Sequence, residues 1–172
     1  MKYFRGAPAW TPERAATRGC LCKINTTELA MDKVMQVSVF SENKPGRIEK
    51  ITRIFAEEGI NILAISITST NGFGIIKLLV DKFELAHEKL KQNGFTVTLN
   101  EVLAIEMRDS PGGLHEVSQI LSGKGINIEN AYVYVVESRA RAFLLVEVKD
   151  IEKAKEILSK EDLKFFRPGD FK

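Results

Sequence analysis

The sequence predicts an α+β protein built from two copies of one unit, in which strands and helices follow in the order βαββαβ. Three observations lead to this expectation. Segments with strand-like and helix-like spacing of apolar residues occur in the same order twice. The dipeptide Pro45-Gly46 returns as Pro111-Gly112, 66 residues later. Gly59-Ile60-Asn61-Ile62 returns as Gly125-Ile126-Asn127-Ile128 at the same distance, so the 172 residues hold two small homologous domains.

The first unit is expected to begin with a strand at residues 34–40, where apolar and polar residues alternate as in a half-buried strand. The turn Asn43-Lys44-Pro45-Gly46 follows, and then a helix that ends near Gly59, a residue type common just past a helix end. The apolar residues of this helix recur at helical spacing, namely Ile48, Ile51, Ile54 and Phe55.

A hairpin, a second helix and a last strand complete the first unit. Residues 62–70 are rich in β-branched side chains, which favour a strand. Asn71-Gly72 is typical of a two-residue hairpin turn, and residues 73–80 form the expected return strand. Residues 83–92 show helical spacing, and residues 95–99 are the expected fourth strand.

The second unit repeats this order. Its expected elements are a strand at 102–107, the turn Asp109-Ser110-Pro111-Gly112-Gly113, a helix over 114–121, hairpin strands at 128–136 and 142–148, a helix at 151–158 and a short strand at 163–166. The distance between the units grows from 66 to 68 by the last helix, where Leu90 aligns with Leu158. We therefore expect two inserted residues at the second hairpin turn, near residues 137–141, because turns tolerate insertion.

A βαββαβ unit folds as a four-stranded antiparallel sheet with both helices on one face, the ferredoxin-like arrangement. An exposed edge strand invites aggregation, so it is normally paired or covered. We expect the two sheets to join edge to edge through their second strands. The result would be one eight-stranded sheet with four helices on one face.

The expected domain boundaries are a leader at 1–30, a first domain at 31–100, a second domain at 101–166 and a C-terminal tail at 167–172. The leader has no helical or strand period, and five basic residues against two acidic ones. It is expected to be a flexible tail or a translation start placed too early, with Met31 as the true start. An organelle transit peptide is the weaker alternative, because the leader lacks an amphipathic face.

Composition and charge exclude several classes of protein. No apolar run is long enough for a membrane span, and no segment resembles a secretory signal, so we expect a cytoplasmic protein. Outside the leader the chain holds 20 basic and 21 acidic residues, too balanced for a dedicated nucleic-acid binder. Cys20 and Cys22 are too few for a disulfide framework, and two isolated histidines leave a closed zinc site short of ligands. No metal and no cofactor is expected.

Four short motifs in register resemble the ACT domain family of small amino-acid-binding regulatory modules. They are Asn43-Lys44-Pro45-Gly46-Arg47-Ile48, Asp109-Ser110-Pro111-Gly112-Gly113-Leu114, Gly59-Ile60-Asn61-Ile62 and Gly125-Ile126-Asn127-Ile128. The resemblance covers about residues 33–166 and is greatest to stand-alone tandem ACT proteins. The first unit is also similar to the regulatory subunit of acetolactate synthase. The resemblance implies a non-catalytic sensor of a free amino acid, acting as a homodimer. The alternative is a regulatory subunit or interaction partner of an amino-acid biosynthetic enzyme.

The turn before the first helix of each unit has independent features of a carboxylate site. Glycine lets a ligand approach the backbone, and the following helix start presents unpaired N–H donors at the positive end of its dipole. The family resemblance places the ligand between such a turn and the second strand of a partner domain, so one or two sites are expected at the domain interface. The candidate ligand-binding residues are Asn43, Pro45, Gly46, Arg47, Asn61, Ile62, Asp109, Ser110, Pro111, Gly112, Gly113, Leu114, Asn127 and Ile128.

The two sites are not expected to be equivalent. Asp109 offers a full negative charge to an ammonium where the first unit has Asn43, and Gly113 leaves more room than Arg47. The alternative for Asn43 and Asp109 is helix capping, a common role for both residue types.

Two other functions share this fold class. Acylphosphatases use an arginine cradle and an asparagine, which Arg47 and Asn61 could imitate, but the second unit lacks the arginine and no nucleophile–base pair occurs in the turns. RNA-recognition domains display aromatic side chains on their central strands, which residues 75–79 and 143–146 lack in the required basic–aromatic pattern. We expect neither an enzyme nor an RNA-binding protein.

Overall fold

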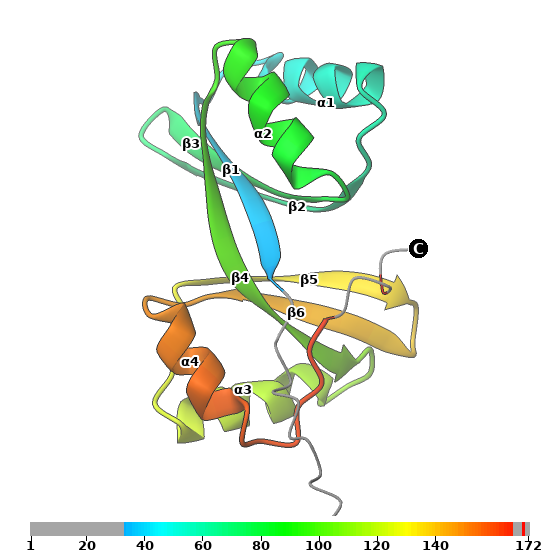
Figure 1. Cartoon of the computed structure of the whole chain (residues 1–172), viewed down its shortest axis with the longest axis vertical. Helices are drawn as coiled ribbons and strands as arrows, with labels where there is room; N and C mark the ends of the chain where they lie inside the picture. The colour runs from blue at the N-terminus through cyan, green and yellow to red at the C-terminus, as the bar shows by residue number, and fades with distance from the viewer. Residues whose placement is uncertain (1–32, 167–169, 171–172) are drawn as a thin grey trace, which may run out of the picture.

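The computed structural model describes residues 33–166 and residue 170. The described helices and strands follow in the predicted order (Figure 1). They are β1 (Val34–Glu42), α1 (Arg47–Glu57), β2 (Ile62–Thr70), β3 (Phe73–Val80), α2 (Phe83–Gln92), β4 (Thr96–Arg108), α3 (Gly113–Gly123), β5 (Asn130–Glu137), β6 (Arg141–Glu147) and α4 (Ile151–Leu158). The predicted leader at 1–30 lies outside the described residues, and so does the tail at 167–172 except for residue 170.

The prediction of an eight-stranded sheet is wrong. The described strands form one six-stranded antiparallel sheet in the order β2-β3-β1-β4-β6-β5. Its two halves join through β4, while the second strands, β2 and β5, lie at opposite ends of the strand order. The expected last strand at 163–166 is reduced to one bridge between Ile105 and Phe165, flanked by two backbone hydrogen bonds to β4.

β4 is a single strand of 13 residues that replaces two expected strands. Its first part pairs with β1, from Thr96 opposite Phe40 to Val102 opposite Val34. Its second part pairs with β6, beginning at Leu103 opposite Val146. Asn100 and Glu101, on either side of the expected domain boundary, both pair with β1. Neither is a glycine or proline that would turn the chain, so the strand runs straight through that boundary.

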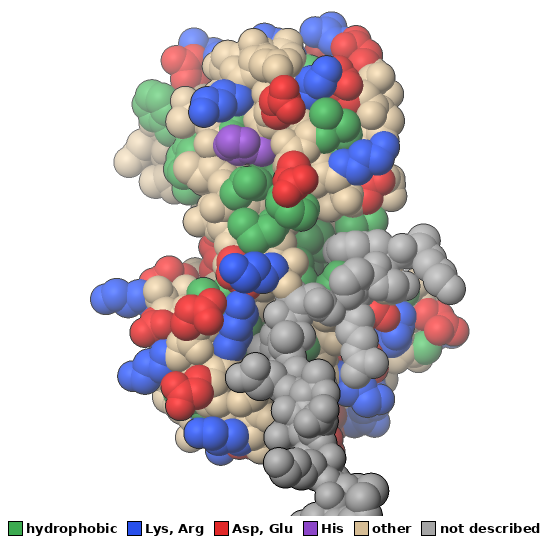
Figure 2. All heavy atoms as spheres, viewed as in Figure 1, with side chains coloured by type: hydrophobic (Ala, Val, Ile, Leu, Met, Phe, Trp, Pro, Cys, Tyr) green, Lys and Arg blue, Asp and Glu red, His purple; other side chains and the backbone are tan. Residues whose placement is uncertain are grey.

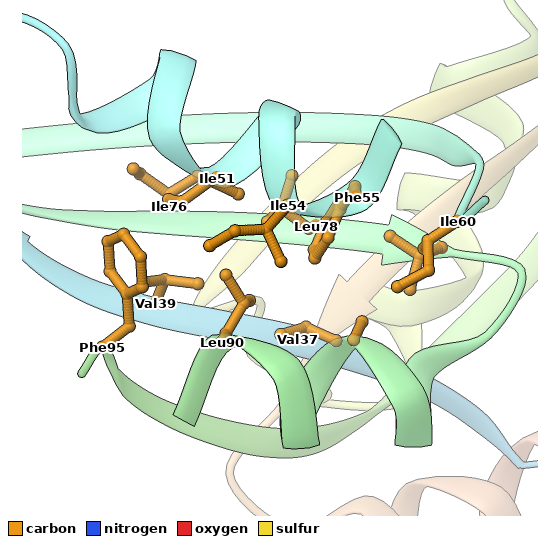
Figure 3. Close-up of a cluster of buried hydrophobic side chains, with 12 residues drawn as sticks. Val37, Val39, Ile51, Ile54, Phe55, Ile60, Ile76, Leu78, Leu90 and Phe95 are labelled. Carbon is orange, nitrogen blue, oxygen red and sulfur yellow. The ribbon is translucent and has the colours of Figure 1, made fainter. Parts of the chain in front are cut away.

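All four helices pack on the same face of this continuous sheet, as predicted. Alternate residues of β4 point to one face, because side chains in a strand alternate with period two. Val97 and Leu99 pack against the apolar cluster under α1 and α2, and Leu103 and Ile105 belong to the cluster under α3 and α4. Figure 3 shows the first of these clusters, in which Phe55 of α1 and Leu90 of α2 converge on the strands.

The opposite face of the sheet is folded onto itself. The helix-free sides of the two halves meet in a third buried cluster of Val34, Leu79, Val102, Ala104, Phe143, Leu145 and Phe166. Figure 1 accordingly shows α1 and α2 at one end, α3 and α4 at the other, and the strands between them. The contact between the two halves therefore consists of two sheet faces and not of two strand edges.

The predicted insertion at the second hairpin turn is confirmed. In the first unit, Thr70 pairs with Phe73 across a two-residue turn. In the second unit, Glu137 pairs with Arg141 across a longer turn, and the register shifts by a further residue between Val135 and Glu137.

No helix in the described part of the chain is long and apolar enough to cross a membrane.

Candidate functional site

The two turns before α1 and α3 have the same backbone conformation. The N-cap residues are Gly46 and Gly112, with left-handed φ angles of 84° and 93° that favour glycine. Neither helix start has a hydrogen bond from a capping side chain, so the capping alternative for Asn43 and Asp109 is wrong. The first intrahelical bonds begin at Lys50 and Glu116, and the N–H groups of Arg47 and Gly113 bond within the turns. The N–H groups of Ile48, Glu49, Leu114 and His115 are therefore available to a ligand.

Asp109 fastens the second turn to the hairpin of its own unit. Its carboxylate accepts a hydrogen bond from the backbone N–H of Arg139 at 2.6 Å, and its own N–H donates to the Ala140 carbonyl at 3.3 Å. Asn43 makes the matching backbone bond, donating its N–H to the Gly72 carbonyl at 2.8 Å. The two turns therefore differ in the carboxylate bond that only Asp109 makes.

Gly113 is required where the second turn meets β4. A Cβ atom at this position would lie 2.1 Å from the carbonyl oxygen of Arg108, which is closer than any real contact. The equivalent residue of the first unit is Arg47, whose guanidinium lies 3.9 Å from the Glu42 carboxylate. The hydrogen bond from Lys44 and its positive charge lower the pKa of Glu42.

A pocket of about 440 Å³ opens beside Gly113, and we call it the second-turn pocket. It lies between the end of β4, the start of α3, the second hairpin and the segment after α4. Its lining residues are Glu106, Met107, Arg108, Gly113, Glu116, Val117, Ile120, Ala140, Arg141, Asp162, Leu163 and Lys164. Three of them are cationic, three are anionic, and apolar side chains from β4, α3 and Leu163 complete the wall.

Two ion-paired arginines border the second-turn pocket. Arg108 pairs with Glu116 of the first turn of α3. Arg141 lies between two carboxylates, 3.9 Å from Glu106 and 3.1 Å from Asp170, and its guanidinium also stands over the Phe143 ring. The pocket therefore presents fixed charges of both signs within the second unit.

The two asparagine loops lie away from the turns. The backbone N–H of Asn61 donates a hydrogen bond to the Asp81 carboxylate at 2.8 Å. The backbone N–H of Asp81 donates in return to the Asn61 carbonyl at 3.2 Å. Asn127 lines a separate pocket of about 250 Å³ with Lys124, Lys149 and Lys153 among its walls. Each loop follows the far end of an 11-residue helix, about 16 Å from the turn that starts it.

Within one chain, the first turn lies away from the contact between the halves. β1 has nine residues and begins at Val34 in the contact between the halves, so the first turn at its other end lies roughly 25 Å beyond that contact. All residues of the second-turn pocket come from the second unit. The structure brings Gly113 into this pocket, and leaves Ser110, Pro111, Gly112 and Leu114 beside it on the exposed turn and helix start.

The pocket walls Arg108, Arg141 and residues 162–164 were not predicted from the sequence. Arg108 directly precedes the turn motif in the sequence, and this position could have identified it as a candidate site residue. The segment 162–164 is distant in sequence and is held beside β4 by the backbone bond from Glu106 to Lys164 and by the adjacent bridge between Ile105 and Phe165. Within the described residues, no group of three or more metal-ligating side chains occurs, and Cys20 and Cys22 lie outside that range.

Comparison with known proteins gives a family and several similar structures. A family model described as the ACT domain pair matches residues 32–172. Protein BT0572 from Bacteroides thetaiotaomicron is 30% identical, with a TM-score of 0.73 over 80% of this chain and 94% of that one.

Two regulatory subunits of aspartate kinase share the fold. The ligand-free subunit from Thermus thermophilus is 20% identical, with a TM-score of 0.56 over 77% of this chain and 96% of that one. The subunit from Thermus flavus is 19% identical, with a TM-score of 0.52 over 74% and 90%. A search of curated proteins finds no match.

Proposed function

Because the chain belongs to the ACT domain pair family, we propose that it is a regulatory protein that binds a free amino acid at the second turn. The family membership confirms the resemblance deduced from the four sequence motifs. The amino acid, the site and the regulatory mode of action belong to the proposal, as do the domain limits at 31–100 and 101–166 and action in the cytoplasm. We also infer that the protein acts by binding and not by catalysis.

The single observation that carries this proposal is the second-turn pocket itself. A free amino acid has a carboxylate, an ammonium and a side chain close together. The pocket offers cationic side chains and the N–H groups at the start of α3 to the carboxylate, and acidic side chains to the ammonium. Its apolar wall, which includes Met107, Val117 and Ile120, suits an aliphatic or otherwise apolar ligand side chain.

The corresponding positions of the first unit carry larger side chains. Arg47 replaces Gly113, and Phe95 stands at the position of Leu163, with the Lys50 ammonium 5.3 Å from its ring centre. We infer that these larger side chains leave less room for a ligand. This difference supports binding at the second turn in preference to the first.

An exposed apolar flank in each unit supports association with another protein. In the first unit, Ile48, Ile65 and Ile67 are each more than two-fifths exposed. Leu114, Val133 and Val135 are similarly exposed in the second unit. Exposed apolar groups that adjoin an edge strand favour a macromolecular partner. We propose a second copy of this chain as that partner, giving a homodimer.

The same flank favours a second candidate function, in which the partner is an amino-acid biosynthetic enzyme such as acetolactate synthase. Light scattering after size-exclusion chromatography separates the two possibilities. A homodimer supports self-association, whereas a monomer leaves the flank for another protein.

A thermal-shift screen against the twenty amino acids tests the proposed binding. A ligand at 100 times its Kd adds about 2.7 kcal/mol of stability, which raises Tm by several degrees in a protein of this size. We expect one amino acid or one chemical group of amino acids to do so. Lys164→Gln should reduce the shift, whereas Lys91→Gln, an exposed lysine of α2 outside the pocket, should not. No shift with any amino acid would contradict the proposal.

A further inference from the structure

A buried polar network crosses the contact between the two halves of the sheet. The amide of Gln36 in β1 is completely buried, and its nitrogen donates to Glu147 at 2.8 Å and to Ser38 at 3.2 Å. Its oxygen accepts a hydrogen bond from the Tyr132 hydroxyl at 2.8 Å. The Lys77 ammonium of β3 pairs with the other oxygen of the Glu147 carboxylate. The network therefore joins β1 and β3 of the first unit to β5 and β6 of the second.

The buried polar groups of this network have hydrogen-bond or ion-pair partners. The side chains of Lys77 and Glu147 are 13% and 18% exposed, so this ion pair is shielded from water. Burial, and secondly the negative charge of Glu147, raise the pKa of Tyr132, which keeps its hydroxyl protonated as a donor. A buried ion pair tolerates the loss of neither partner, because the remaining charge is left without compensation.

The internal repeat shows what stands at the equivalent positions. The strand registers align Gln36, Ser38 and Lys77 of the first unit with Val102, Ala104 and Leu145 of the second. In the other direction, Glu147 of the second unit aligns with Leu79 of the first. All four aligned residues, Leu79, Val102, Ala104 and Leu145, belong to the apolar cluster between the halves.

The contact between the halves thus has two pseudo-equivalent sides, one polar and one apolar. The contact of Lys77 with Glu147 on the polar side corresponds to Leu145 and Leu79 on the apolar side. Only the pairing of a first unit with a second unit brings the ammonium and the carboxylate together. If two first units met through this face, each Lys77 would face Leu79, and if two second units met, each Glu147 would face Leu145.

We propose that this network selects the first unit as the partner of the second, and excludes pairing of like units through the same face. A homologous repeat creates this hazard, because two similar faces can pair in any combination, within one chain or between chains. Pairing of like units would bury two uncompensated charges, whereas the observed pairing buries none.

Charge reversal tests the proposal in the full-length protein. K77E places two carboxylates in the contact, and E147K places two ammonium groups there. We expect each to lower Tm by about 10 °C or more, and the double variant K77E/E147K to recover most of the loss. Reversing the exposed pair of Glu156 and Lys160 is the matched control and should change Tm little. A double variant no more stable than the weaker single variant would overturn the proposal.

A second measurement tests partner choice directly. K77E and E147K carry complementary charges. In a mixed dimer, the first unit of each chain could therefore pair with the second unit of the other chain and restore an ion pair at both contacts. We expect native mass spectrometry of the co-refolded, isotopically distinguished variants to show severalfold more mixed species than two labelled wild-type samples. Mixed species at the wild-type level would show that the pair does not select partners.

Discussion

At the scale of single residues, Gly113 gives the sharpest test of the second turn. Its replacement by alanine would place a Cβ atom 2.1 Å from a backbone oxygen, so the turn must shift. We expect Gly113→Ala to destabilise the protein by about 3 kcal/mol in urea unfolding. Gly123→Ala is the control, because that helical glycine has open space around its Cβ position, and should stabilise by about 0.5–1 kcal/mol. Equal effects would show that Arg108 does not confine the turn.

Asp109 and Asn43 occupy equivalent positions, and we predict unequal effects on amino-acid binding. Asp109 holds the hairpin residue next to the pocket wall through its carboxylate, and adds a negative charge near the site. Asn43 is tied through its backbone N–H, which alanine keeps. Asp109→Ala should weaken binding by about 1.5–3 kcal/mol, and Asn43→Ala by about 0.5–1.5 kcal/mol.

Calorimetric titration with the best amino acid of the screen measures this difference, with urea unfolding of both variants as the stability control. Loss of stability without loss of affinity would assign Asp109 to the hairpin alone. A larger affinity loss for Asn43→Ala would reverse the order of the two sites.

The residues of the turns could be predicted from the sequence, and the pocket walls could not. Pro-Gly in two copies marks a local backbone conformation, which depends on a few adjacent residues. The pocket instead needs Arg141 and Lys164, which reach the turn through strand pairing and a backbone bond over long sequence distances.

At the scale of elements, β4 is one continuous strand where the sequence pattern predicted two. The apolar alternation of residues 97 and 99 continues in phase at 103 and 105, and the intervening Glu101 points to the same face. There it pairs with Lys155 of α4. Burial lowers the pKa of Lys155, but hydrogen bonds to Glu101 and Glu152 outweigh it and raise the pKa overall. The sequence does not show that Glu101 has a partner on a helix, so the continuity of β4 through the expected boundary could not be predicted.

The leader provides a prediction at the same scale. Residues 1–30 lack the apolar periodicity of a packed element. A chain that starts at Met31 should therefore unfold at the same temperature as the full chain in differential scanning calorimetry. A Tm lower by several degrees would show that the leader packs on the described fold.

At the scale of the whole molecule, neither unit is complete without the other. A cut after residue 100 would divide β4 and expose the apolar cluster between the halves. A domain of about 65 residues is marginally stable even when its surface is intact. We expect the isolated fragment 31–100 to aggregate or dimerise in analytical ultracentrifugation. A stable monomer would contradict the dependence of the units on each other.

The two-unit architecture could be predicted, but the way the units join could not. Each unit leaves two edge strands, and the sequence pattern does not rank one edge above the other. The absence of a turn at residues 100–101 lets the fourth strand of one unit become the first strand of the next. Figure 2 shows basic and acidic side chains mixed over the visible face of both halves, in keeping with the small net charge of +2.

The most direct test of the proposed function is an NMR titration of the ¹⁵N-labelled full-length protein with the amino acid that gives the largest thermal shift. We predict saturable shifts of the backbone amides of Leu114 and His115, at the start of α3, together with those of pocket residues such as Lys164. The amides of Ile48 and Glu49, at the start of α1, should move much less. Shifts confined to the start of α1, or to the contact between the halves, would contradict binding at the second turn.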